Sequence, residues 1–165
     1  MRLFTTFLIL MLIGLWMNIV FNHYVQIVGL KFNWILVFLL IQTFRQSNLG
    51  IAFFGILAGL IMDALSHGIM GLYGTSFFLT LLITNQVKRV FFANTLTALG
   101  LAVVSMSIVE GWISIIILSI FEPELELSNL ILSVTIPLSL LHGLVAPIIL
   151  QFVIWVENLF LGDLA

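Results

Sequence analysis

Charged residues are scarce in this sequence. Asp, Glu, Lys and Arg make up 7% of its 165 residues, whereas 62% of the residues are hydrophobic. Soluble globular domains carry roughly 25% charged residues, so a water-soluble fold of this chain would lack the polar groups to cover its surface. We therefore predict that its solvent is a lipid bilayer. The formal net charge of −2 also excludes the basic surface that nucleic acid requires.

Cysteine is absent, which excludes disulfides, thiolate nucleophiles and cysteine-bound metals. Alanine is absent from the N-terminal apolar run at 3–21, and the first alanine of the chain is Ala52. The Ala-x-Ala cleavage site that is typical of a secretory signal peptide is therefore missing near this run. We expect residues 3–21 to remain in the protein as its first transmembrane helix.

Motifs of intramembrane enzymes are also missing. The chain has no His-Glu-x-x-His sequence for a zinc protease and no Gly-x-Ser-Gly loop for a rhomboid-like nucleophile. A diaspartyl protease needs two aspartates on facing helices, and Asp63 is the single aspartate within an apolar segment. We expect no enzymatic activity, no cofactor and no metal site.

Short polar segments divide the chain into six apolar segments. A transmembrane helix needs about 20 mostly apolar residues. We predict an all-α fold, with residues 1–165 forming a single membrane domain that is a bundle of six transmembrane helices. The expected helices are about 3–21, 30–44, 49–66, 70–87, 95–121 and 128–156. The last two are longer than the bilayer requires, so they must tilt, kink or extend beyond it.

The basic residues orient these helices, because Lys and Arg are enriched in cytoplasmic loops. A cytoplasmic N-terminus leaves Lys31 and the acidic segment 122–126 on the outer side of the membrane. The other basic residues then all face the cytoplasm: Arg2, Arg45, Lys88 and Arg89. We therefore expect both termini to be cytoplasmic.

One apolar helix is expected to carry an acid in line with glycines. This stripe, at helical spacing, consists of Gly55, Gly59, Asp63 and Ser66, and Gly71 lies in the corner that follows. Glycines four residues apart let another helix approach closely in lipid. The stripe is therefore either a docking site for a partner helix or a structural corner that packs within the chain. His67, in the same corner, is expected at the level of the lipid headgroups.

A second set of polar residues lies inside the last two apolar segments. Glu110 has Ser107 and Ser114 on the same helical face, and Ser139 and His142 form a similar stripe in the next segment. Polar side chains within a membrane avoid lipid, so the two stripes should pack against each other or line a polar crevice.

The segments KFNWILVFLLIQTF and GIAFFGILAGLIMDALSHGIMGLYGTSFFLTLLI, within residues 31–83, resemble the bacterial rod shape-determining protein MreD family. The residues that carry the resemblance are Asn33, Trp34, Gly55, Gly59, Asp63, Ser66 and Gly71. Chain length and the six expected spans also agree with that family. The sequence departs from the family pattern at Phe32, where proline is usual, and at His67, where glycine is usual.

The resemblance implies a non-enzymatic scaffold of the cell-elongation machinery in the bacterial inner membrane, which supports lateral peptidoglycan synthesis. It implies direct binding to MreC, a single-span periplasmic coiled-coil protein. Through MreC it implies a link to a class B penicillin-binding protein, RodA and MreB filaments, with membrane lipid as a further partner. MreD-like proteins are also similar in fold to the vitamin-binding subunits of energy-coupling-factor transporters. The alternative function is therefore small-molecule binding, with Glu110 and His142 lining the ligand site.

Overall fold

The computed structural model describes residues 2–24, 31–46, 49–66, 69–88, 95–122 and 127–161, and every regular element in these ranges is helical. The fold is therefore all-α, as the sequence predicts. The helices are α1 (Arg2–Tyr24), α2 (Trp34–Arg45), α3 (Gly50–Ser66), α4 (Leu72–Val87), α5 (Leu96–Phe121), and a last helical segment made of α6 (Leu127–Leu130), the π-helix η1 (Ile131–Thr135) and α7 (Ile136–Leu161).

These six helical segments occupy the expected ranges except at the end of the last, which continues to Leu161 rather than 156, and at the start of the second. This helix begins at Trp34 rather than at residue 30, because residues 31–33 are not helical. The side chain of Asn33 accepts a hydrogen bond from the backbone N–H of Leu36 at 3.1 Å and so caps the first turn. The expected positions of His67 and Arg89 lie outside the described residues, as do the last four residues of the acidic segment 122–126.

Helix α2 is the core of the bundle. Every residue from Ile35 to Thr43 is buried, and α2 packs against α1, α3, α4, α5 and α7. Its 12 residues rise by roughly 18 Å, which is much less than the hydrocarbon thickness of about 30 Å. A helix that is apolar on all sides is typically surrounded by other helices, as α2 is in this bundle.

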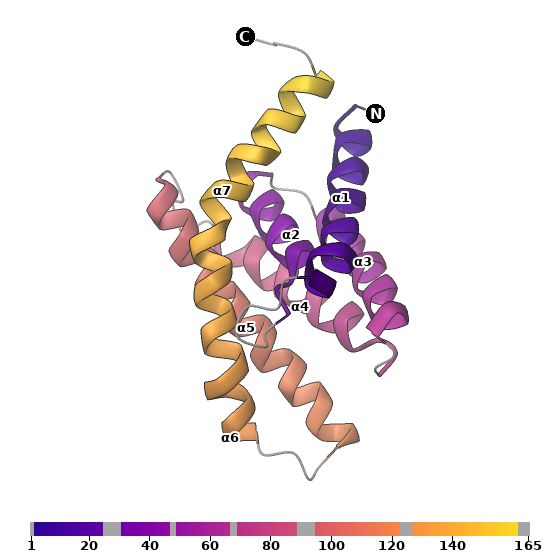
Figure 1. Ribbon diagram of the computed structural model, residues 1–165, viewed down its shortest axis with the longest axis vertical. Helices are drawn as coiled ribbons and strands as arrows, with labels where there is room; N and C mark the ends of the chain where they lie inside the picture. Colours follow the sequence, from indigo (N-terminus) through magenta and orange to yellow (C-terminus); the bar gives the residue numbers. More distant parts are fainter. Residues whose placement is uncertain are drawn as a thin grey trace.

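The other helices form two pairs around α2. Helix α3 packs closely on α4, and α5 packs closely on α7. In Figure 1, α7 runs along one side of the molecule, α1 and α3 lie on the other side, and α2 lies between them. The α4–α5 contact joins the two pairs.

The outer faces of the bundle are apolar. Among the described residues, two helices are long and apolar enough to cross a membrane, Leu96–Phe121 and Ile131–Leu159, and three apolar helices are shorter. On α3 the exposed large apolar side chains are Phe53, Leu57, Leu60, Ile61 and Leu65, and α1, α5 and α7 expose similar sets. Exposed apolar surface on this scale is typical of contact with lipid or with another protein.

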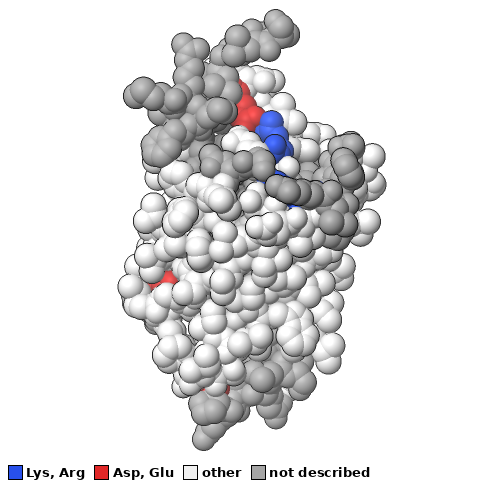
Figure 2. All heavy atoms as spheres, turned by 180° about the vertical axis from the view of Figure 1, so that it is seen from behind, with Lys and Arg blue, Asp and Glu red and all other residues white. Residues whose placement is uncertain are grey.

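Charged side chains gather near one end of the bundle. Arg45 and Glu157 form an ion pair of 2.7 Å, and Gln42 donates a hydrogen bond to the same carboxylate. The ammonium group of Lys88 donates to the backbone carbonyls of Thr43 and Gln46, which end α2. Figure 2 shows blue and red atoms side by side near this end and a largely uncharged surface below them.

Candidate functional site

Asp63 organises the corner between α3 and α4. Its side chain is 1% exposed, and its carboxylate accepts three backbone N–H groups, from Tyr73 at 2.9 Å, Gly71 at 3.0 Å and Gly74 at 3.2 Å. These amides belong to the start of α4, where the first four N–H groups of a helix lack intrahelical acceptors. The negative charge also lies at the positive end of the helix dipole. Asp63 therefore caps α4 from the preceding helix.

The chain can reach this geometry because residue 71 is a glycine. Gly71 has a φ of +92°, a backbone conformation that costs other residues steric strain. Its carbonyl accepts a hydrogen bond of 2.6 Å from the hydroxyl of Thr75. The turn at Gly71 thus aims the first amides of α4 back at Asp63.

The two other glycines of the stripe let α3 and α4 approach each other. A Cβ atom on Gly59 would lie 2.5 Å from Cα of Gly74, and one on Gly55 would lie 2.5 Å from Cδ1 of Leu81. Both positions are buried, so α4 of the same chain already covers this face of α3. The glycine stripe thus contacts a neighbouring helix of its own chain, an arrangement that fits the structural-corner alternative for Gly55, Gly59 and Asp63. Ser66 is exposed and donates to the backbone carbonyl of Asp63 at 3.2 Å.

A second candidate site is a cavity of about 240 Å³ between α5 and the last helical segment. All five residues expected in a polar crevice line it: Ser107, Glu110, Ser114, Ser139 and His142. The remaining polar or small lining residues are Lys31, Asn33, Tyr73, Gly111 and Thr135, and apolar side chains such as Leu72, Ile115 and Leu138 complete the wall. The cavity thus combines an apolar wall with a few convergent polar groups, as ligand sites in proteins do.

Glu110 is the acidic group of this cavity. Its Oε1 atom accepts hydrogen bonds from the hydroxyls of Ser114 at 2.8 Å and Ser76 at 3.2 Å. Ser114 lies one turn further along α5, whereas Ser76 comes from the first turns of α4. The carboxyl group therefore ties α4 to α5 beside the corner that Asp63 holds.

His142 has both ring nitrogens occupied within the protein. The backbone N–H of Asn33 donates to Nε2 at 3.2 Å, and Nδ1 lies 2.6 Å from the hydroxyl oxygen of Ser107. Because an amide N–H can only donate, Nε2 is an acceptor. The neutral ring therefore carries its proton on Nδ1, and this N–H donates a hydrogen bond to the hydroxyl oxygen of Ser107. The edge of the ring also packs on Phe32, at a centroid distance of 4.7 Å. His142 thus links α7 to α5 and to the start of α2.

The wall formed by the last helical segment has a π-helical turn. Thr135, the last residue of η1, lies so close to Gly111 of α5 that a Cβ on the glycine would overlap the threonine side chain. The hydroxyl of Ser139 donates to the carbonyl of Thr135 at 2.6 Å. Single π-helical turns inside α-helices occur frequently at functional sites, and this one borders the cavity.

Sequence reasoning missed the cavity residues that come from distant segments. Tyr73 belongs to α4, and Lys31 and Asn33 precede α2, so no helical spacing connects them to Glu110. Ser76 of α4 donates to Glu110, but it shares its helix with Thr75, Thr80 and Thr84, so its polarity alone did not single it out. Among the described residues, no three His, Cys, Asp or Glu side chains lie close enough together to hold a metal ion.

The chain matches no family model, no curated protein and no solved structure.

Proposed function

We propose that this chain is a multi-pass membrane scaffold of the MreD type, which binds MreC and supports lateral peptidoglycan synthesis. The observation that carries the proposal is the α3–α4 corner. Gly59 allows the close approach of α4, Gly71 provides the left-handed turn, and Asp63 accepts three amides of α4. Three of the residues that carry the resemblance to MreD, namely Gly59, Asp63 and Gly71, thus have physical tasks in one unit, which supports the proposal.

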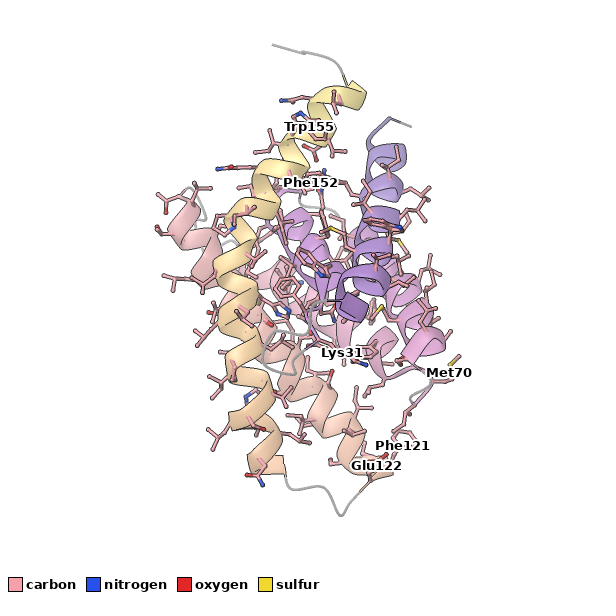
Figure 3. The ribbon with its side chains drawn as sticks, viewed as in Figure 1. Lys31, Met70, Phe121, Glu122, Phe152 and Trp155 are labelled. Atoms are coloured by element: carbon pink, nitrogen blue, oxygen red, sulfur yellow. The ribbon has the colours of Figure 1, made fainter. Side chains whose placement is uncertain are left out.

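A six-span arrangement in the bacterial inner membrane, with cytoplasmic termini, is part of the proposal. In its support, α1 begins and α7 ends at the same end of the molecule (Figure 1). The basic residues Arg45 and Lys88 lie near that end, as the enrichment of Lys and Arg on the cytoplasmic side requires. Lys31 and Glu122 lie in the opposite half of the molecule (Figure 3). Short helices such as α2 are accommodated because their neighbours surround them.

We assign the contact with MreC to the outer face of α3. This helix lies at the edge of the bundle in Figure 1, and its inner face is fixed against α4 by the corner. Phe53, Leu57 and Leu65 point outward, with exposed fractions of 62%, 54% and 47%. A preformed apolar helix face of this kind suits the single transmembrane helix of MreC, because packing rather than burial from water drives helix association in lipid.

The test is recovery of partners from the native membrane. The tagged chain is extracted in mild detergent, and co-purified proteins are identified by mass spectrometry. We expect a single-span coiled-coil protein and a class B penicillin-binding protein. Leu57→Trp should reduce this recovery several-fold, because the indole prevents close packing on α3. The matched control Leu144→Trp changes an outward leucine of α7, which is 73% exposed, and should leave recovery unchanged. Equal recovery with both variants would refute the assignment to α3, and absence of the coiled-coil protein would refute the scaffold itself.

The second candidate function is a vitamin-binding subunit of an energy-coupling-factor transporter. The observation in its favour is the cavity with Glu110 and His142 in its wall. This function predicts that the same purification yields paired nucleotide-binding ATPases and a coupling membrane subunit. It also predicts a vitamin bound to the purified protein at near-stoichiometric amounts, which mass spectrometry of a denatured extract would detect.

A further inference from the structure

Glu110 has an unused hydrogen-bonding atom in the wall of the cavity. Its side chain is 9% exposed, and both serine hydroxyls donate to the same oxygen, Oε1. No described residue donates a hydrogen bond to Oε2. This oxygen is not among the fully buried polar atoms that lack a partner, so it remains accessible from the cavity. A carboxyl oxygen in this position is an acceptor that lacks a donor.

No charge within the described residues compensates Glu110. Among the described residues, the ion pair joins Arg45 to Glu157, and it lies near the C-terminal end of α7, away from Glu110. His142 does not compensate the acid, because its two ring nitrogens are occupied by Ser107 and the amide of Asn33. A buried carboxylate is costly unless a cation or several donors balance it, so the cavity lacks the positive partner that its geometry calls for.

A basic residue with no ion pair among the described residues lines the same cavity. Lys31 is exposed and lies just before α2, in the half of the molecule that also contains Met70 and Glu122 (Figure 3). It forms no ion pair with Glu110 or with any other described residue. The cavity therefore presents a carboxyl group in its buried wall and a basic group at its exposed edge, and the two are not paired with each other.

The size of the cavity limits the ligand. Its volume of about 240 Å³ exceeds the roughly 150 Å³ that holds a benzene molecule, and it lies just below the usual range for drug-sized ligands. The site therefore suits a small molecule or the headgroup of a lipid whose chains extend along the apolar outer surface of α5 and α7.

We propose that this cavity binds a zwitterion, whose protonated amine donates to Oε2 of Glu110 and whose anionic group contacts Lys31. The ammonium group must carry N–H donors, because a carboxyl oxygen with a free lone pair requires one. Two sources share this chemistry: the headgroup of an ethanolamine phospholipid and a small free amino acid or phosphoethanolamine-like compound. The inference concerns the cavity alone and does not depend on binding of MreC.

The first experiment measures lipid and headgroup binding to the purified full chain in neutral detergent. Native mass spectrometry with dioleoyl phosphatidylethanolamine and dioleoyl phosphatidylcholine compares two headgroups that differ in their N–H donors. Titration calorimetry with phosphoethanolamine tests the free zwitterion. We expect the ethanolamine lipid to be retained over the choline lipid. If phosphoethanolamine alone binds, the source is a free zwitterion, and if the lipid alone binds, the source is the membrane. Equal retention of both lipids, without binding of phosphoethanolamine, would refute the proposal.

Variants of the two charged residues test the assignment. Glu110→Gln keeps an acceptor for Ser76 and Ser114 but removes the charge, and should weaken binding about ten-fold to a hundred-fold, the range for a hydrogen bond to a charged group. Glu122→Gln, at an exposed position outside the cavity, is the control and should bind as the unmodified chain does. Undiminished binding by Glu110→Gln would overturn the assignment.

Lys31→Met is the second variant, because an exposed position tolerates this change without loss of folding. It should weaken the binding of phosphoethanolamine or of the ethanolamine lipid several-fold. The binding of ethanolamine, which has no anionic group, should stay unchanged. Equal effects on both amines would contradict the contact between Lys31 and the anionic group. These measurements use purified protein, so their failure is separable from failure of the partner recovery described above.

Discussion

The most exacting prediction concerns Asp63, since one buried side chain accepts three backbone amides at 2.9, 3.0 and 3.2 Å. A hydrogen bond to a charged group contributes about 1.5–3 kcal/mol, and an ordinary N-cap contributes about 1 kcal/mol. Three such bonds at the lower value give about 4–5 kcal/mol. We expect Asp63→Ala to lower the free energy of unfolding by about 4 kcal/mol, because it leaves Gly71, Tyr73 and Gly74 without their acceptor. Native proteins have total stabilities of about 5–15 kcal/mol, so this is a large share.

Asp63→Asn separates the charge from the shape. In the native corner Oδ1 accepts from Tyr73, while Oδ2 accepts from both Gly71 and Gly74. An amide can present only one oxygen, so its NH₂ group must face at least one backbone N–H. We expect Asp63→Asn to lower the free energy of unfolding by about 2 kcal/mol, which is less than the loss expected for Asp63→Ala.

The assay is SDS-induced unfolding from mild-detergent micelles, followed by far-ultraviolet circular dichroism. Ser66→Ala is the control, because it removes an exposed hydroxyl that donates to the carbonyl of Asp63, and it should cost no more than about 0.5 kcal/mol. If Asp63→Ala costs less than about 1 kcal/mol, the amides of α4 find other acceptors, and the reasoning about this corner is wrong.

Three further changes test the packing, the charged end and the cavity. Gly59→Ala should cost about 1–3 kcal/mol in the same assay, because its Cβ meets the backbone of Gly74, which cannot give way as a side chain can. Arg45→Met should cost less than about 1 kcal/mol, and less still at high salt, because the arginine of its pair with Glu157 is 32% exposed. Glu110→Gln, without added ligand, should leave the free energy of unfolding unchanged or raise it, because no described cation balances this acid. A loss above about 2 kcal/mol would mean that the carboxylate charge itself stabilises the empty protein.

The local signals in the sequence predicted the helices well but not their burial. In the structure Asn33 caps α2 and Gly71 makes the turn before α4, so these helices begin at Trp34 and Leu72, a few residues after the expected starts at about 30 and 70. Whether an apolar helix faces lipid or other helices depends on its neighbours, and both environments select the same side chains. The burial of α2 on every side therefore had no signature, although its 12-residue length is short for a membrane span.

The candidate sites were predictable where one helix presents them. The spacing of Ser107, Glu110 and Ser114 on α5 defines a face, and the structure brings that face to a cavity. The contribution of Ser76 depends on how α4 packs against α5, which no spacing along the chain records. The same limit applies to the glycine stripe, because spacing predicts that a helix approaches Gly59 but not whether that helix belongs to the same chain.

The two acids of the bundle show why a buried carboxylate does not by itself indicate a function. Asp63 is saturated, since both oxygens accept amides that need acceptors, so its burial is explained by the start of α4. Glu110 is satisfied on one oxygen only, and the other is accessible from a cavity that also has Lys31 at its edge. A group that serves only the fold is expected to use its full hydrogen-bonding capacity, because an unused buried acceptor costs stability. The unused capacity of Glu110, rather than its charge or its depth, is what distinguishes the proposed ligand site from the structural corner at Asp63.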